Sequence, residues 1–126
     1  MRKLAMALGL TAVSLVSGCQ TGPSMPTGVW YLTGMGEGDA PRGVTLEIAP
    51  DLSFSGQAPC NTYRGQASLE GDTFSIGPIM ATRMACEDLD AEVMYLTYLG
   101  AVQSVATDGD RLSLTTAQGV LLSFTR

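Results

Sequence analysis

Histidine is absent from this chain of 126 residues, and no other absence restricts its function more. Histidine is the commonest general base near neutral pH, and nucleophilic cysteines usually depend on it for activation. No such pairing is available to Cys60 or to any other cysteine of the chain. We therefore expect a protein that is not an enzyme, and a hydrolase is the disfavoured alternative.

Lysine is almost as scarce, because Lys3 is the only one, and acidic residues outnumber basic residues by twelve to seven. If the N-terminal segment with Arg2 and Lys3 is removed, five arginines remain, and the formal charge becomes 5 − 12 = −7. A surface of this sign repels nucleic acid and anionic lipid headgroups. We expect no nucleic-acid partner, and any attachment to a membrane has to come from acyl chains.

The sequence also lacks an apolar run long enough to span a bilayer. The longest uncharged and mostly apolar run covers residues 4–16, whereas a spanning helix needs about 20 residues. It follows Arg2 and Lys3 and leads into small residues before Cys19, which is the layout of a secretory signal peptide. The ending Val16-Ser17-Gly18-Cys19 resembles a bacterial lipobox. This resemblance implies that Cys19 is acylated and becomes the first mature residue.

Three segments follow from this interpretation. Residues 1–18 are a lipoprotein signal peptide, residues 19–26 are a small, polar tether, and residues 27–126 form one domain. Gln20 is not the aspartate associated with retention at the inner membrane. By the same resemblance we expect an exported, membrane-anchored monomer, at the outer membrane and facing the periplasm if the host is Gram-negative.

Cysteine is limited to three residues, and their number fits export. If Cys19 carries lipid, Cys60 and Cys86 remain as an even pair, and such pairs in exported proteins are usually disulfides. We expect a bond between them. In the chain-entropy model, closing a loop of this length contributes roughly 3–4 kcal/mol.

Strand signals dominate the domain, as alternating apolar and polar residues separated by turn residues. The expected strands are residues 29–33, 44–48, 52–55, 62–69, 73–76, 102–107, 112–114 and 120–125. The segment Asp88–Leu99 differs, because Leu89, Val93, Leu96 and Leu99 recur at helical spacing and acidic residues crowd its start. We place Gly100 at the helix C-terminal cap. This order of five strands, one helix and three strands predicts a mainly β fold, an antiparallel barrel or sandwich with a helix over one opening or edge.

Three ordered motifs and the segments after them resemble the META domain, also called HslJ-like, of bacterial envelope lipoproteins. The matching segments are Trp30-Tyr31-Leu32, Cys60–Gly65, Ile79–Cys86, Glu92 with Tyr95, Leu96 and Leu99, Leu112–Leu114 and Leu122–Arg126. The resemblance covers about residues 27–126. It implies a small antiparallel β-barrel-like domain of about eight strands interrupted by one α-helix. It also implies links to stress response, antibiotic tolerance or secretion without an established catalytic activity. One departure is Pro59, where the family often has glycine.

The candidate binding surface is drawn from the residues around the cysteines. Asn61 and Tyr63 lie two apart, so on a strand they share a face, and Arg64 and Arg83 are candidates for recognising an acidic partner. The alternative is that Asn61 satisfies a turn, Tyr63 packs with its hydroxyl bonded, and the arginines pair with surface carboxylates. We expect no cofactor and no metal, because the acidic stretch 87–92 lacks the glycine and distal glutamate of a calcium loop.

Two functions of a binding protein stay open at this point, beside the disfavoured hydrolase. The favoured one is a lipid-anchored, non-catalytic binding or scaffolding module of the envelope with an unknown envelope protein as partner. The alternative within binding proteins is a barrel that holds a small apolar ligand or inhibits an enzyme. Two features fit either function. The methionines Met80, Met84 and Met94 line a groove or fill the core. The segment Gly34–Gly43 is a binding loop or a simple hairpin connection.

The lipobox interpretation is tested by mass spectrometry of the membrane-extracted protein. We expect a mature chain that begins at Cys19 and carries a diacylglyceryl group on it. A mature chain that begins elsewhere, or one with an unmodified Cys19, would show that the interpretation is wrong.

Overall fold

A computed structural model describes residue 9 and residues 25–126 of the chain. The expected signal peptide, Cys19 and most of the expected tether therefore lie outside the described residues. Within the described part, no helix has both the length and the apolar character needed to cross a membrane.

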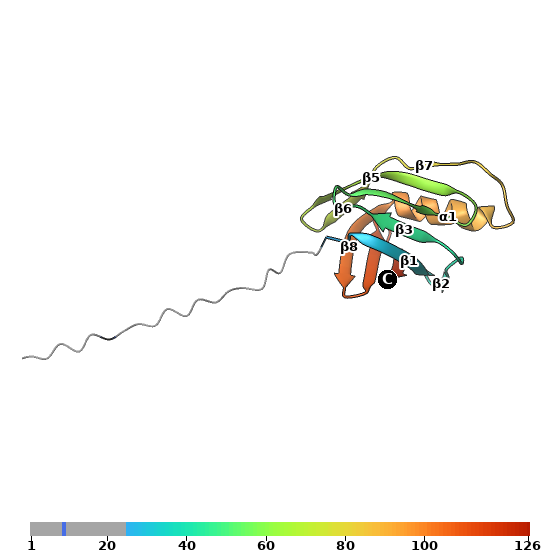
Figure 1. The fold of residues 1–126 in the computed structure, drawn as a ribbon. Coiled ribbons are helices and arrows are strands. Elements are labelled where there is room, and N and C mark those ends of the chain that lie inside the picture. The colour runs from blue at the N-terminus through green and yellow to red at the C-terminus, as the bar shows by residue number, and fades with distance from the viewer. Residues whose placement is uncertain (1–8, 10–24) are drawn as a thin grey trace, which may run out of the picture.

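Within residues 25–126, eight antiparallel strands close into a barrel, and one helix accompanies them (Figure 1). The strands are β1 (Gly28–Met35), β3 (Thr45–Ile48), β4 (Ser53–Gln57), β5 (Thr62–Glu70), β6 (Thr73–Ile76), β8 (Val102–Asp108), β9 (Arg111–Thr116) and β10 (Leu121–Thr125). Around the barrel they follow the order β10-β9-β8-β6-β5-β4-β3-β1, and β1 pairs back with β10. The expected mainly β fold and its element order are confirmed. Two short strands were not predicted: β2 (Gly38–Asp39) pairs with β1, and β7 (Met80–Ala81) pairs with β5.

Apolar side chains from alternate strand positions fill the barrel. In β9, for example, Leu112 and Leu114 are buried while Ser113 between them is partly exposed. The largest interior side chains are at most 1 % exposed, and they are Trp30, Phe74, Tyr95 and Phe124. The interior is thus a packed core, in which removal of apolar surface from water is the main source of stability.

Strand β5 is the longest of the barrel, and both of its edges are paired. β4 pairs with residues 62–66 on one edge, while the other edge pairs with β6 at residues 67–70 and with β7 at residues 63–64. Between β6 and β7, Gly77 donates to the carbonyl oxygen of Gln66 at 2.9 Å, and Pro78 has no N–H to donate. The chain therefore follows β5 after β6 and arrives beside the loop that contains Cys60.

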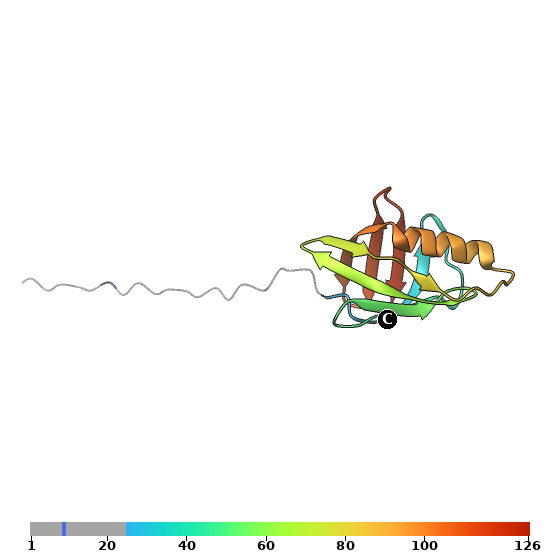
Figure 2. The ribbon, with the colours of Figure 1, turned by 90° about the horizontal axis from the view of Figure 1, so that it is seen from above.

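Helix α1 (Leu89–Gly100) lies across one opening of the barrel (Figure 2). The helix is confirmed, but its expected apolar face is only partly correct, because Leu99 is buried and Leu96 half-buried while the other two positions are exposed. It buries Glu92, Tyr95 and Leu99, whereas Leu89 and Val93 are 36 % and 57 % exposed. Gly100 is the last helical residue instead of the cap, which is Ala101. The helix turns Glu92 and Tyr95 inward because hydrogen-bond partners for their polar groups lie at this opening.

A cation–π contact joins the beginning and the end of the domain. The guanidinium of Arg126 lies 4.4 Å from the centre of the Trp30 ring and donates to the carbonyl oxygen of Thr27 at 3.1 Å. Trp30 in turn donates from Nε1 to the carbonyl oxygen of Pro26 at 3.0 Å. Because Trp30 is fully buried, its indole is a sensitive reporter of the folded state.

Gly65, inside β5, is predicted to be intolerant of any side chain. A Cβ atom at this position would overlap the ring of Phe54, which is itself buried in the core. We expect Gly65→Ala to lower the free energy of unfolding by about 1–3 kcal/mol through overpacking. Urea unfolding followed by the fluorescence of Trp30 measures this change.

Gly34, inside β1, provides the matched control, because a Cβ there would lie 3.5 Å from Cβ of Ser123, an ordinary contact distance. Gly34→Ala is expected to leave the unfolding midpoint almost unchanged. Equal midpoints for Gly65→Ala and the unsubstituted protein would contradict the packing argument.

Candidate functional site

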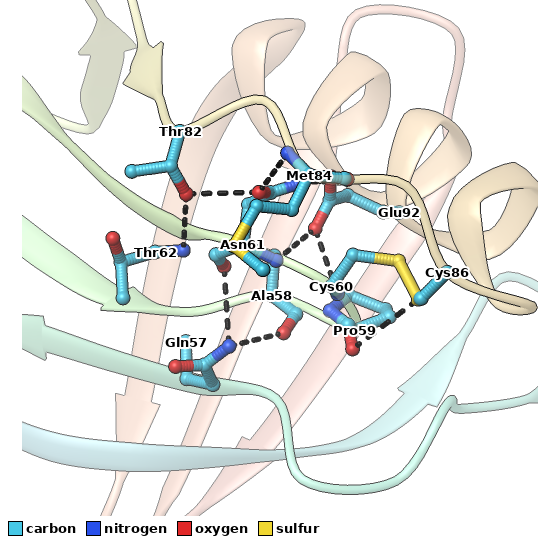
Figure 3. Close-up of a disulfide and its surroundings, with 10 residues drawn as sticks. All are labelled: Gln57, Ala58, Pro59, Cys60, Asn61, Thr62, Thr82, Met84, Cys86 and Glu92. Atoms are coloured by element: carbon cyan, nitrogen blue, oxygen red, sulfur yellow. Dashed lines mark hydrogen bonds between the residues drawn. A yellow bond between two sulfur atoms is a disulfide. The ribbon is translucent and has the colours of Figure 1, made fainter.

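A disulfide connects the β4–β5 loop with the segment that leads into α1 (Figure 3). Cys60 and Cys86 are joined across 26 residues of sequence, and their Cα atoms are 5.8 Å apart. Cys60 is partly buried and Cys86 is exposed. Both cysteines of the domain are therefore engaged with each other, and neither is a free thiol.

Beside the disulfide, the buried carboxylate of Glu92 accepts three hydrogen bonds from the same loop. Its Oε1 accepts from the backbone N–H groups of Cys60 at 2.9 Å and Asn61 at 2.7 Å, and its Oε2 accepts from Nδ2 of Asn61 at 2.6 Å. Glu92 is only 4 % exposed. A buried carboxylate is costly unless charge-assisted hydrogen bonds of this kind compensate for lost water. The helix is thus fixed to the loop by a charged group.

Asn61 uses every hydrogen-bonding position of its side chain. Its Oδ1 accepts from Oγ1 of Thr82 at 2.9 Å and from the N–H of Met84 at 2.7 Å, while Nδ2 donates to the carbonyl oxygen of Met84 at 2.9 Å and to Glu92. A side-chain amide has two acceptor positions and two donor positions, and all four are occupied. Asn61 therefore joins the loop, the segment 82–84 and the helix at one point.

Tyr63 and Tyr95 share a hydroxyl network inside the barrel. The hydroxyl of Tyr63 donates to the carbonyl oxygen of Thr45 at 2.6 Å and lies 2.7 Å from the hydroxyl of Tyr95. Since the single proton of Tyr63 is given to Thr45, Tyr95 is the donor in the second bond. Burial raises the pKa of both tyrosines well above the usual value, so both stay protonated near neutral pH. They act as structural groups and not as bases.

The residues of the expected binding surface divide between the interior and the outside. Asn61 and Tyr63 do share a face, but it is the interior face, where they are 3 % and 2 % exposed. This corrects the expectation that they form a recognition surface, and the alternative of a satisfied loop and a packed tyrosine describes them. Arg64 and Arg83 are both exposed.

Glu92 and Tyr95 were not predicted as site residues. Their helical segment had matched the resemblance, but the carboxylate was attributed to the charge at the helix N-terminus. Only the fold reveals its partners, because the backbone groups that it binds are 31 and 32 residues away in the sequence.

The outer face of the sheet above this network carries a groove centred on Arg64. Antiparallel register places Glu47 opposite Ser55, Ser55 opposite Arg64, and Arg64 opposite Met80. Two hollows lie on either side of this row, and both are lined by Ser55, Arg64 and Met80. We call this feature the Arg64 groove. The hollow nearer the disulfide is otherwise lined by Thr45, Gly56, Gln57, Thr62, Tyr63, Ala81 and Thr82.

Arg64 is not engaged by the domain itself. Within residues 25–126, the ion pair that the structure contains joins Arg126 to Asp110, and Arg64 makes no side-chain hydrogen bond. Hydroxyl and amide side chains and Met80 surround Arg64 in the hollow nearer the disulfide, whereas the other hollow also contains Glu47. A guanidinium is suited to bind a carboxylate through two parallel hydrogen bonds, and the hollow without Glu47 is the better place for it. In the same described part, His, Cys, Asp and Glu side chains form no group of three or more that could hold a metal ion.

Glu92→Gln tests the network around the disulfide. The glutamine oxygen can accept both backbone N–H groups, but its amide nitrogen then faces Nδ2 of Asn61, donor against donor. Turning the Asn61 amide would instead set its nitrogen against the N–H of Met84. With the disulfide intact, we expect the free energy of unfolding to fall by about 1–3 kcal/mol.

The matched control is Glu47→Gln, which removes the same charge from an exposed position on β3. It is expected to change the free energy of unfolding by less than about 0.5 kcal/mol. If both substitutions shift urea unfolding equally, the buried carboxylate does not have the stabilising role described above.

The fold is similar to those of three solved structures, and the first two are as follows. A protein from Burkholderia xenovorans, whose structure was determined by NMR, has a TM-score of 0.62 and 24 % identity, over 78 % of this chain and 80 % of its own. A DUF4847 family protein from Bacteroides vulgatus, known from a crystal structure, has a TM-score of 0.61 and 14 % identity, over 79 % of this chain and 92 % of its own. Both identities are below 25 %, so these similarities concern the fold alone.

No curated protein matches the chain significantly. The family model of the META domain matches residues 23–126, which includes every strand of the barrel, the helix and the cysteine–asparagine–tyrosine region. The expected resemblance is therefore confirmed, and the chain belongs to the META domain family.

Proposed function

We propose that this META domain protein is a lipid-anchored, non-catalytic binding or scaffolding module of the cell envelope, which captures a partner at the Arg64 groove. One observation carries the proposal. The polar groups of Asn61, Tyr63 and Glu92 are used up by internal hydrogen bonds, whereas Arg64 stands between two hollows and has no side-chain partner within residues 25–126. The chemistry of the groove favours a partner that offers a carboxylate to Arg64.

Burial of the motif side chains supports binding over catalysis. Within residues 25–126, Glu92 is the one buried carboxylate and is committed to three donors. The buried hydroxyls of Tyr63 and Tyr95 are committed to each other and to Thr45. A general base or nucleophile must reach a substrate proton or atom. These groups face inward and are occupied, so a hydrolase stays the disfavoured alternative.

Packing of the barrel interior disfavours the apolar-ligand alternative. A barrel that holds a small ligand needs an internal cavity lined by apolar side chains. Here Trp30, Phe74, Tyr95 and Phe124 occupy the interior, and the hollows described above lie on the outer face of the sheet. The outer surface is therefore the better place to seek a partner.

The proposed role also includes attachment to the membrane. Acyl chains on Cys19 would hold the domain at the membrane through the tether of residues 19–26, and the acidic surface would keep it off the headgroups. The proposed location is the outer membrane, facing the periplasm, if the host is Gram-negative. The family resemblance makes stress response and secretion the processes in which to seek the partner.

Site-specific photo-crosslinking in the intact envelope tests this proposal. A photoreactive residue at Thr62, which lines the groove, is compared with one at Ala106, which is exposed on β8. We expect a discrete adduct from Thr62 and none from Ala106. Arg64→Gln should reduce the adduct, because a lost charge-assisted hydrogen bond weakens binding by about tenfold or more.

Arg111→Gln is the matched control, since it removes the same charge from an exposed position on β9. It should leave the adduct from Thr62 unchanged. The proposal fails if the adduct is unaffected by Arg64→Gln, or if Thr62 gives no adduct. Reproducible turnover of a peptidoglycan, ester, peptide or phosphate substrate by the purified protein, abolished by one carboxylate or serine substitution, would show that the protein is an enzyme instead.

A further inference from the structure

A third hollow lies where the turn between β1 and β2 and the turn between β9 and β10 approach α1. The turn between β1 and β2, the outward side of α1 and the turn between β9 and β10 form its walls. Its lining residues are Met35, Gly36, Glu37, Gly38, Asp39, Met94, Tyr98, Gln118, Gly119, Val120 and Leu121. We call it the hairpin–helix cleft. It shares no lining residue with the Arg64 groove.

The floor of the cleft is apolar and open to solvent. Met94 is 48 % exposed and Leu121 is 42 % exposed, while Tyr98 and Val120 are half-buried beside them. Glycines in both turns leave the cleft without side chains that would fill it. Exposed apolar groups that gather in a hollow are typical of interaction surfaces, and methionine adapts its shape to different partners.

The charge at the rim has one sign only. Glu37 and Asp39 are the charged residues that line the cleft, and both are exposed. Neither forms an ion pair with any residue in the described part of the chain. No arginine lines the cleft, so a bound cation would meet two unpaired carboxylates and no repelling neighbour.

We propose that the hairpin–helix cleft docks a basic, amphipathic segment of a partner protein, in which apolar side chains are flanked by Lys or Arg. The apolar side chains would cover Met94 and Leu121, and the cations would lie beside Glu37 and Asp39. An anionic membrane surface does not fit, because the same carboxylates would face its headgroups. The proposal stands apart from the Arg64 groove, whose chemistry favours a partner of the opposite charge.

Methionine methyl NMR reports on both surfaces in one experiment, because Met94 lines the cleft and Met80 lines the Arg64 groove. The sample is the disulfide-bonded protein with Cys19→Ser, which prevents acylation and keeps every described residue. The probe is a synthetic amphipathic peptide of leucine and lysine. We expect a saturable shift of the Met94 methyl signal while the Met80 signal stays in place. The matching peptide of leucine and glutamate should not shift Met94.

Charge-matched variants separate the cleft from the general acidity of the domain. Glu37→Gln with Asp39→Asn should weaken binding of the leucine–lysine peptide by about two- to tenfold. Glu70→Gln with Asp72→Asn removes two exposed carboxylates from the hairpin between β5 and β6 and should leave the affinity unchanged. Leu121→Gln should also weaken binding, whereas Val29→Gln, at an exposed apolar position outside the cleft, should not.

Four outcomes would overturn the inference. They are the absence of a saturable Met94 shift, a shift of Met80 in its place, equal effects of the two charge-paired variants, and equal binding of the acidic peptide. A Met94 shift that follows dilution of the protein without peptide would assign the cleft to a second copy of the chain. Overlay of the methyl spectra of each variant without peptide verifies that the fold is unchanged.

Discussion

The buried carboxylate of Glu92 is the contact on which the arrangement of this domain depends. Its three donors come from two consecutive residues, Cys60 and Asn61, so the start of the helix and the β4–β5 loop cannot move independently. Through Asn61 the same network reaches Met84. A charge without water must keep all of its donors to remain stable, so helix, loop and the segment before the helix are fixed together. The disulfide adds a covalent link at the place where these three segments meet.

Alternation along β5 connects this internal network to the outer surface of the barrel. Tyr63 points into the barrel and bonds to Thr45 and Tyr95, so the next residue, Arg64, must point outward. The bonds from Asn61 to Thr82 and Met84 hold the chain after β7 against β5, which places Met80 beside Arg64. Asn61 and Tyr63 are therefore buried, and their role is to position the groove that lies above them.

Local pattern was sufficient for the strands and insufficient for the helix face. Alternation such as Leu112, Ser113 and Leu114 identifies a half-buried strand from neighbouring residues alone, and all eight barrel strands followed from it. The helix was placed by the same means, but its buried face includes Glu92, which any apolar pattern assigns to solvent. Asn61 and Tyr63 were expected to share an outer face, although the alternation of Tyr63 and Ala67 with Arg64 already favours the inner face for Tyr63. Burial of the polar side chains of Glu92 and Asn61 depends on hydrogen bonds between segments about 30 residues apart, which no local period encodes.

The same network connects the two proposed surfaces mechanically. Arg64 lies on β5, three residues after Asn61, and Met94 lies on α1, two residues after Glu92. Because Asn61 and Glu92 are hydrogen-bonded to each other, the groove and the cleft are linked through these bonds. A link made of short, charge-assisted bonds and a neighbouring disulfide leaves little freedom for the helix to move relative to β5. Partners held at the groove and at the cleft would therefore keep a fixed separation and orientation. That geometry suits a scaffold that brings an acidic and a basic partner together, and it gives little room for a switch that passes a signal from one surface to the other.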